Sequence, residues 1–188
     1  MNIFTLIIGF LAYLIGALPT GYLIAKLKGI ADIRAHGSGN IGATNVSRML
    51  GKHYFFLIFF LDAGKALLFI RTIQPYFDFN HLCFFAGILL FGNGCSIFLH
   101  GSGGKGVATL FGLLLALNHS TALILLGIWF LFLMMTQTVG IASVAAAIWM
   151  PFCTYAAHNP SLFLFSLFAT LWIVYTHQSN IKAYWNKH

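Results

Sequence analysis

The sequence predicts an all-α integral membrane protein, with a single membrane-embedded domain over residues 1–188 and about seven transmembrane helices. The chain is 60% hydrophobic and only 7% charged, whereas a soluble domain carries about 25% charged residues. Its mean hydropathy is +0.88. Its apolar runs are long and continuous rather than alternating, which favours helices over a transmembrane β-barrel.

The expected spans follow the apolar runs in order. The first run, 3–25, is expected to kink in its second half, because Gly16, Pro19 and Gly21 lie there. It lacks a positively charged start, so we expect a retained span rather than a signal peptide. A polar loop occupies 29–52, and further spans are expected at about 54–70, 82–99, 121–135, 139–156 and 162–175.

The run 107–117 is shorter than the others. Such a segment cannot cross about 30 Å of hydrocarbon as a straight helix. Either this helix begins deep in the protein and leaves on the far side, or it forms half of one long kinked helix with the next span. The sequence leaves both arrangements open.

The distribution of positive charge predicts the orientation in the membrane. With seven spans, Arg71 lies on one side and the other side carries most of the cationic residues: Lys26, Lys28, Arg34, Arg48, Lys52, Lys105, Lys182 and Lys187. Six spans would separate the two tail lysines from this group. Because Lys and Arg are enriched in cytoplasmic segments, we expect the N-terminus outside, the C-terminus inside, and two glycine-rich loops facing the cytoplasm.

Composition also restricts the function. The net charge is +7, but ten Lys and Arg spread along a membrane chain favour an anionic substrate or lipid headgroups, and we expect no nucleic-acid partner. Glu is absent and Asp occurs only at positions 32, 62 and 78, so a mechanism based on paired carboxylates is nearly excluded. No Cys/His cluster has ligand spacing, so we predict no metal site.

The stretch 36–48, HGSGNIGATNVSR, is suited to binding an anion. Its glycines allow positive φ, which lets backbone N–H groups converge on one point. Small hydroxyl and amide side chains add donors, and Arg48 can hold a phosphate through two parallel hydrogen bonds. The alternative interpretation is a flexible connector whose arginine serves only the membrane topology.

A second stretch, GSGGKGVAT at 101–109, favours the phosphate interpretation for both loops. Here Lys105, the glycine N–H groups and the N-terminus of a helix starting near Val107 can all face an anion. Neither loop joins a strand to a helix, so a Rossmann site is excluded. Gly106 follows Lys105 where a Walker A motif needs Ser or Thr, so this loop is not a P-loop.

Two polar pairs stand out beside these loops. Asp62 and Lys65 lie on one face of an expected span, where each charge costs about 2.5–3.5 kcal/mol. The pair either neutralises itself or lines a polar cavity below the loops, and we favour the cavity. His177 and Asn180 share a face if the last helix continues, on the same side as the loops. We favour a functional role for them over that of interfacial residues.

These motifs resemble those of the bacterial membrane glycerol-3-phosphate acyltransferases that use acyl-phosphate as donor, the PlsY family. The resemblance covers essentially the whole chain and includes GSGNIGATNVSR at 37–48, LDAGK at 61–65, GGKGVAT at 103–109, Ile141-Ala142-Ser143 and H-x-x-N-I at 177–181. It implies seven spans in the bacterial plasma (inner) membrane, with the active site facing the cytoplasm.

The resemblance implies a transferase of phospholipid synthesis that works without a cofactor. A fatty acyl group would pass from acyl-phosphate to the 1-hydroxyl of sn-glycerol 3-phosphate, giving lysophosphatidic acid and inorganic phosphate. A donor-forming phosphate acyltransferase would act upstream, and the acyl chain would lie between spans, in membrane lipid. Because the donor is an activated mixed anhydride, positioning and electrostatics can suffice without a covalent nucleophile. The proton would go to His177 or to a substrate phosphate.

The same resemblance assigns the site residues. A catalytic group would hold glycerol 3-phosphate and poise its hydroxyl: Ser38, Arg48, Lys105, His177 and Asn180. The acyl-phosphate would contact Thr44, Asn45, the backbone of Gly103, Gly104 and Gly106, and Ser143. The predicted substrate-binding set is completed by Gly39, Asn40, Lys65 and Thr109.

The chain departs from the family pattern at supporting positions. Asn93 replaces a histidine, Ser96 a proline, Gly101-Ser102 an aromatic–lysine pair, Ala66 a glycine, Gly140 a serine, and Gln178-Ser179 an Arg-Glu pair. These departures motivate an alternative: a divergent paralogue with lost or changed acyl transfer that binds lipid or a phospho-ligand. A small anion transporter is a third hypothesis, although the spans flanking the two loops show no internal repeat.

Overall fold

The structure, a computed structural model, describes residues 2–186, and every regular element in this range is helical. The predicted all-α fold is therefore confirmed, while Lys187 lies outside the described residues. The α-helices are α1 (Ile3–Ala17), α2 (Thr20–Leu27), α3 (Ala43–Leu50), α4 (His53–Ile73), α5 (Phe79–Gly94), α6 (Val107–Leu117), α7 (His119–Thr136), α8 (Val139–Tyr155), α9 (Pro160–Thr176) and α10 (Gln178–Trp185). Short 3-10 turns occupy Ile33–Ala35, Gln74–Tyr76 and Ile97–Leu99.

The first expected span is bent where the sequence predicts. Pro19 has no N–H to continue α1, and α2 leaves at 42° to α1. At Gly16, an added Cβ would lie 2.1 Å from the backbone oxygen of Leu89. The absence of a side chain at Gly16 therefore lets α1 lie directly against α5, immediately before the bend.

The expected span 82–99 falls within the segment 79–99, which is long and apolar enough to cross a membrane, but its C-terminal end is not α-helical. Helix α5 ends at Gly94, and a separate 3-10 turn, Ile97–Leu99, follows. Ser96 donates its hydroxyl to the carbonyl of Ala17 at 2.6 Å, which ties this turn to the end of α1. The apolar composition of 95–99 concealed a turn that brings the chain to the second glycine-rich loop.

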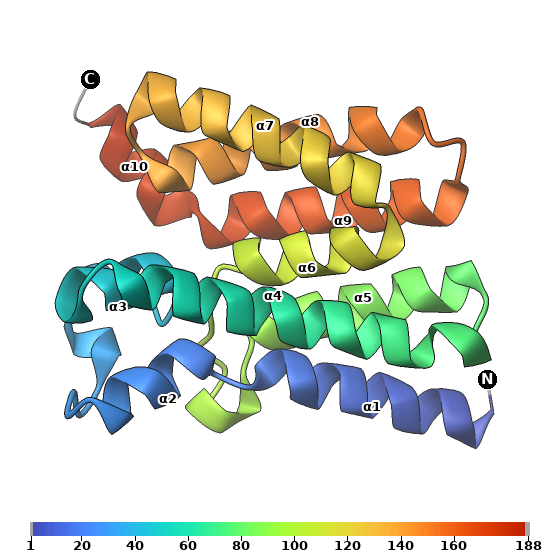
Figure 1. Cartoon of the computed structure of the whole chain (residues 1–188), viewed down its shortest axis with the longest axis horizontal. Coiled ribbons are helices and arrows are strands. Elements are labelled where there is room, and N and C mark those ends of the chain that lie inside the picture. Colours follow the sequence, from blue (N-terminus) through green and yellow to red (C-terminus); the bar gives the residue numbers. More distant parts are fainter. Residues whose placement is uncertain (1, 187–188) are drawn as a thin grey trace.

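The short helix α6 begins inside the protein. Asn118 interrupts the helical backbone, and its side chain accepts the Thr121 N–H at 2.9 Å to start α7. Figure 1 shows that α7 then runs back in the opposite direction. The structure thus selects the helix that starts deep in the protein over the long kinked helix.

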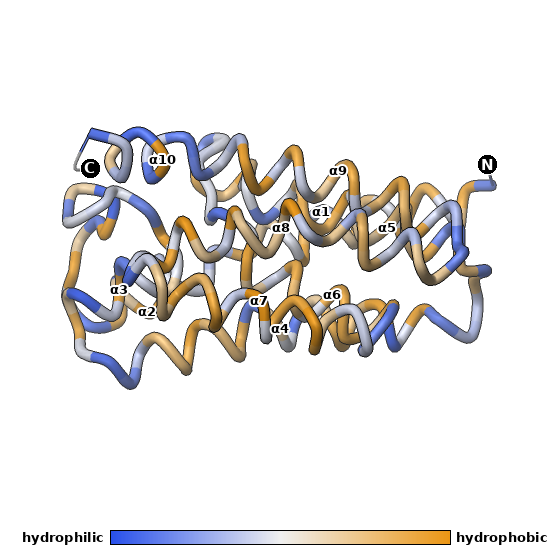
Figure 2. The backbone as a smooth tube through the Cα atoms, turned by 90° about the horizontal axis from the view of Figure 1, so that it is seen from above, coloured by the Kyte–Doolittle hydropathy of each residue, from blue (hydrophilic) through white to orange (hydrophobic). Residues whose placement is uncertain are grey.

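Polar segments lie at the two ends of the molecule and apolar helices between them (Figure 2). By length and composition, two helical segments can cross a membrane, 79–99 and His119–Thr136, and up to four if the bent pairs α1–α2 and α9–α10 each count as one span. Helices α6 and α8 are apolar but shorter. Many large apolar side chains are exposed, including Phe10, Phe60 and Leu171, as expected for an integral membrane protein.

Helix α6 lies between two layers (Figure 1). On one side it packs against α4, next to α5 and α1, and on the other it approaches α7 and α9, which pack with α8. At Gly112, an added Cβ would lie 2.0 Å from the backbone oxygen of Ala63, so α6 and α4 touch closely. The N-terminus of α6 is thereby held inside the molecule, between these two layers (Figure 1).

Candidate functional site

The first glycine-rich loop is folded around the side chain of Asn45, which is 2% exposed. Its Oδ1 accepts the Ser38 N–H at 2.9 Å, and its Nδ2 donates to the carbonyls of His36 at 2.9 Å and Asn40 at 2.8 Å. Gly37 and Gly39 have positive φ values of 58° and 70°. The predicted binding residue Asn45 therefore uses its amide to shape the loop.

Helix α3 follows this loop and carries Thr44 and Arg48 four residues apart, so both lie on one face. Asn40 supports the start of the helix by accepting the Gly42 N–H at 2.8 Å. Arg48 is exposed and forms no ion pair or hydrogen bond within residues 2–186. Its guanidinium is thus available to an anion.

The second loop is held against the end of α5. The carbonyl of Asn93 accepts the Gly104 N–H at 2.9 Å, and an added Cβ at Gly103 would lie 2.3 Å from the carbonyl oxygen of Gly94. Gly106 has a φ of 86°, in the left-handed region, and starts α6. Only glycine fits such a close approach at Gly103 and such a conformation at Gly106 without strain.

This geometry leaves a set of donors unused. The backbone N–H groups of residues 105–109 have no acceptor among the described residues, and they lie at the positive end of the α6 dipole. Lys105 donates to the side-chain oxygen of Asn180. Burial, and the nearby charge of Arg48, lower the pKa of Lys105 below its usual value. Lys105 and Arg48 have no carboxylate partner within residues 2–186, so these two cations create a site for an anion.

His177 lies at the break between α9 and α10, where the two helices meet at 56°. It is 3% exposed, and its Nδ1 lies 2.8 Å from the carbonyl of Ile173. Because a carbonyl only accepts, Nδ1 carries the proton and Nε2 is left as an acceptor. Burial lowers the pKa of His177 to about 4, so the ring is neutral at pH 7.

His177 and Asn180 come together through this bend rather than through a continuous helix. The Asn180 N–H donates to the His177 carbonyl at 2.9 Å, in the first turn of α10. Gly140 lies directly beneath Asn180, since an added Cβ would be 2.5 Å from Nδ2. The departure from serine at position 140 thus makes room for the Asn180 side chain.

One cavity of about 600 Å³ joins these groups, a volume in the usual range for ligand sites. Twelve of the fifteen predicted site residues line it: Ser38, Asn40, Thr44, Asn45, Arg48, Gly104, Lys105, Gly106, Thr109, Ser143, His177 and Asn180. Its remaining wall is largely apolar and includes Phe55, Phe59 and Phe60 of α4 and Trp129 and Phe130 of α7.

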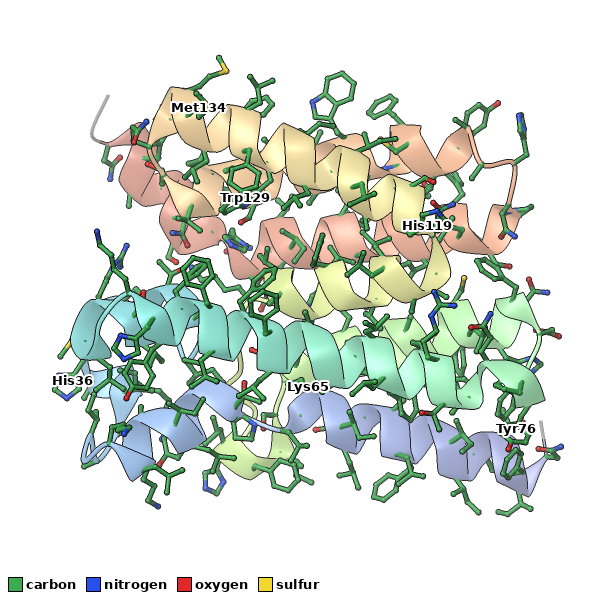
Figure 3. The ribbon with its side chains drawn as sticks, viewed as in Figure 1. His36, Lys65, Tyr76, His119, Trp129 and Met134 are labelled. Atoms are coloured by element: carbon green, nitrogen blue, oxygen red, sulfur yellow. The ribbon has the colours of Figure 1, made fainter. Side chains whose placement is uncertain are left out.

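Three predicted residues do not line this cavity: Gly39, Gly103 and Lys65. Gly39 and Gly103 shape their loops. Lys65 pairs with Asp62 at 2.7 Å and donates to the carbonyls of Gly16 at 3.2 Å and Leu18 at 2.8 Å. Figure 3 shows it between α4 and α1. The mid-span pair therefore neutralises itself and supports the α1–α2 bend; only Asp62 reaches the cavity.

Residues that sequence reasoning had not assigned also line the cavity. Asn93 does so from α5, although the sequence marks it only as a departure from a family pattern. Trp129 donates its indole N–H to Ser143 at 3.1 Å, and Ser143 donates to the carbonyl of Val139 at 2.8 Å. No motif contains Trp129, and the pairing of α7 with α8 that brings it to Ser143 is not visible in the sequence.

Comparison with known proteins gives a consistent result. The family model described as glycerol-3-phosphate acyltransferase matches residues 6–187. A glycerol-3-phosphate acyltransferase of Prochlorococcus marinus is 40% identical over 185 residues, covering 96% of this chain and 92% of the relative. One of Thermosynechococcus vestitus is 41% identical over 190 residues, covering 94% and 89%.

Two solved structures have the same fold. Both are crystal structures of PlsY (YgiH), an integral membrane glycerol 3-phosphate acyltransferase. The glycerol 3-phosphate form has a TM-score of 0.90 and 35% identity, and covers 95% of this chain and 90% of that one. The lysophosphatidic acid form has a TM-score of 0.88 and 34% identity, with the same coverage.

Proposed function

The chain belongs to the glycerol-3-phosphate acyltransferase family, and on this premise we propose how its cavity carries out acyl transfer. A fatty acyl group passes from acyl-phosphate to the 1-hydroxyl of sn-glycerol 3-phosphate, giving lysophosphatidic acid and inorganic phosphate. The supporting observation is the division of the cavity. A cationic end with Arg48 and Lys105 adjoins an aromatic, apolar wall, and an acyl-phosphate has the same division.

The cationic end holds phosphate. Arg48 can form two parallel hydrogen bonds to it, and the unused N–H groups of residues 105–109 supply further donors at the start of α6. Lys105 and Asn180 lie in contact, so a phosphate near Lys105 is also near Asn180 in the first turn of α10. Ser38 and Thr44 border the same space. Both substrates carry phosphate, and this end of the cavity is where they meet.

Acyl transfer then needs positioning rather than a covalent intermediate. The 1-hydroxyl oxygen attacks the acyl carbon, the bond between that carbon and the phosphate oxygen breaks, and the electron pair leaves with phosphate. Charge that develops on the phosphate is stabilised by Arg48, Lys105 and the α6 N-terminus. Holding both substrates in one reactive geometry supplies much of the remaining reduction in the activation barrier.

His177 positions the attacking hydroxyl. Its Nδ1–H is fixed on the Ile173 carbonyl, so Nε2 accepts a hydrogen bond from the hydroxyl. A ring with a pKa of about 4 is a weak base. The departing phosphate is the better final acceptor, and we assign the proton to it.

The acyl chain lies along the apolar wall between α4 and α7. Phe60 and Phe130 line the cavity and are also exposed on the outer surface, so this wall is continuous with the surface that faces membrane lipid. A lipid-soluble donor can enter and a lysophospholipid can leave here. The donor requires an upstream enzyme that forms acyl-phosphate.

We further propose seven spans in the plasma membrane, with the N-terminus outside and the cavity opening to the cytoplasm. Seven of the cationic residues named above, all but Lys187, lie in or next to α2, α3, α10 and the two glycine-rich loops, and Arg71 lies near the other end of α4. Figure 3 shows His36 at one end of the molecule and Tyr76 at the other. Green fluorescent protein fused after His188 should fluoresce, because it would lie in the bacterial cytoplasm. If that fusion does not fluoresce, and alkaline phosphatase fused at the same position is active in the periplasm, this orientation is contradicted.

Product identification tests the reaction. Purified protein should convert palmitoyl-phosphate and glycerol 3-phosphate into lysophosphatidic acid, detected by mass spectrometry, and should form none when either substrate is omitted. Binding of both substrates without this product would instead support the divergent, inactive paralogue.

A further inference from the structure

Asn93 occupies the last turn of α5, directly under the second glycine-rich loop. Its backbone carbonyl accepts the Gly104 N–H, whereas its side chain takes no part in this bond. The residue is only 6% exposed, and its carboxamide forms no hydrogen bond with any group in residues 2–186. The residue lines the cavity. A nearly buried amide that lacks a protein partner calls for one from a ligand or water.

The carboxamide lies close to the phosphate-binding backbone. A Cβ added at Gly104 would be 3.1 Å from its Oδ1 and 3.7 Å from its Nδ2, and one added at Gly106 would be 3.8 Å from Oδ1. No other group in residues 2–186 fixes the carboxamide, so rotation about its side-chain bonds can present its NH₂ to this space. The hydroxyl of Thr109, in a residue 1% exposed, is a second buried polar group without a partner, and Thr109 lines the same cavity.

The charges around this space select the chemistry of the ligand. Lys105 and Arg48 line the cavity and have no carboxylate partner among the described residues. The N–H groups at the start of α6 add positive potential. In such a field the ligand is an anion, and an anion takes the donor side of a carboxamide. Asp62, the carboxylate that lines the cavity, is paired with Lys65.

We propose that Asn93 is a further substrate-contacting residue, whose carboxamide donates to an oxygen of a phosphate bound at the 104–106 loop. This proposal rests on the proposed function for the identity of that phosphate, which acyl-phosphate and glycerol 3-phosphate both supply. It adds a further neutral donor to a site that already contains two cations, glycine N–H groups, hydroxyls and the Asn180 carboxamide.

Two variants and a matched control test the proposal. Asn93→Leu removes the donor and keeps the backbone carbonyl that holds Gly104. Asn93→Asp is nearly isosteric and puts a negative charge in its place. Asn80→Leu makes the same change in the first turn of α5, where Asn80 is exposed, about 20 Å away by helix rise. Thermal unfolding of the detergent-solubilised proteins checks that each variant folds.

The readouts are the KM for each substrate and the inhibition constant of inorganic phosphate. Asn93→Leu should weaken phosphate inhibition by about tenfold or more, the usual scale for a hydrogen bond to a charged group. Asn93→Asp should weaken it further as the pH rises and the new carboxyl ionises, and Asn80→Leu should leave it within about twofold. A raised KM for palmitoyl-phosphate alone, or for glycerol 3-phosphate alone, identifies which substrate supplies the phosphate.

The proposal is overturned if both Asn93 variants fold and keep wild-type KM values and phosphate inhibition. A direct titration with inorganic phosphate separates this outcome from failure of the proposed function. Wild-type protein that lacks turnover but binds phosphate, with binding weakened in the Asn93 variants, would refute acyl transfer and support Asn93. If the wild-type protein catalyses acyl transfer, and the wild type and the Asn93 variants bind phosphate equally well, acyl transfer is supported and the role of Asn93 is refuted.

Discussion

Replacing Lys65 by methionine should destabilise the protein without affecting substrate binding. The Lys65 ammonium pairs with Asp62 at 2.7 Å, and both side chains are nearly buried, at 11% and 13% exposure. It also donates to the carbonyls of Gly16 and Leu18, at the end of α1 where Pro19 prevents a normal helical bond. Asp62 in turn accepts the hydroxyl of Thr20 at 2.7 Å. One ammonium thus stabilises the bend and neutralises a buried carboxylate.

The magnitude follows from what Lys65→Met leaves behind. Removing one partner of a buried ion pair typically costs about 3–5 kcal/mol, because the remaining charge is unpaired. This is a large share of the roughly 5–15 kcal/mol that stabilises an ordinary domain. The double variant Asp62→Asn/Lys65→Met should recover part of the loss, because asparagine can still accept from Thr20 and carries no charge.

Thermal unfolding in detergent measures the stability, and KM values measured well below the unfolding temperature measure binding. We expect Lys65→Met to lower the unfolding temperature markedly, the double variant to lie between it and the wild type, and KM values to change less than about threefold. A Lys65→Met variant that unfolds like the wild type but has a strongly raised KM would refute this reasoning and restore Lys65 as a substrate-binding residue.

Three further predictions concern the site. The His177 imidazole should protonate near pH 4, measured by an NMR titration of 15N-labelled histidine in the wild type and in His177→Ala; a midpoint near 6.5 would contradict a neutral, buried ring. Gly140→Ser should raise the KM for glycerol 3-phosphate about tenfold, because the serine Cβ would displace Asn180 from Lys105. Unchanged kinetics would show that a side chain at position 140 does not displace Asn180. Asn45→Leu should destabilise the first loop by about 2–4 kcal/mol, since three loop hydrogen bonds are lost, seen as faster hydrogen exchange at 36–42; wild-type exchange there would refute its role.

The sequence was informative where local chemistry determines the structure. Pro19 predicts the bend between α1 and α2, Gly106 and Val107 predict the start of α6, and the motif residues Arg48, Lys105 and His177 do meet in one cavity. Such features depend on a missing N–H, a positive φ or a run of polar residues within an apolar chain. Each of these features can be predicted from a residue and its neighbours in the sequence.

The sequence was less informative where packing between distant segments determines the local structure or the partners of a side chain. The turn after Gly94 is hidden in an apolar run, and Gly94 lies so close to α9 that an added Cβ would be 2.4 Å from the Trp172 ring. Lys65 was expected in the cavity, but the α1 carbonyls that bind it become acceptors only through the bend. Asn93 reaches the phosphate loop through α5, from a position outside both glycine-rich stretches. Each of these contacts joins residues that are far apart in the sequence.

The most direct test of the central account is phosphate release by the wild-type protein and its Arg48→Ala, Lys105→Ala and His177→Ala variants, given palmitoyl-phosphate and glycerol 3-phosphate. Asn80→Leu, at the far end of α5, serves as the control. The account predicts release that requires both substrates, is preserved in Asn80→Leu and is abolished in the other three. Unchanged turnover in Arg48→Ala and Lys105→Ala, or release that does not need glycerol 3-phosphate, would contradict it.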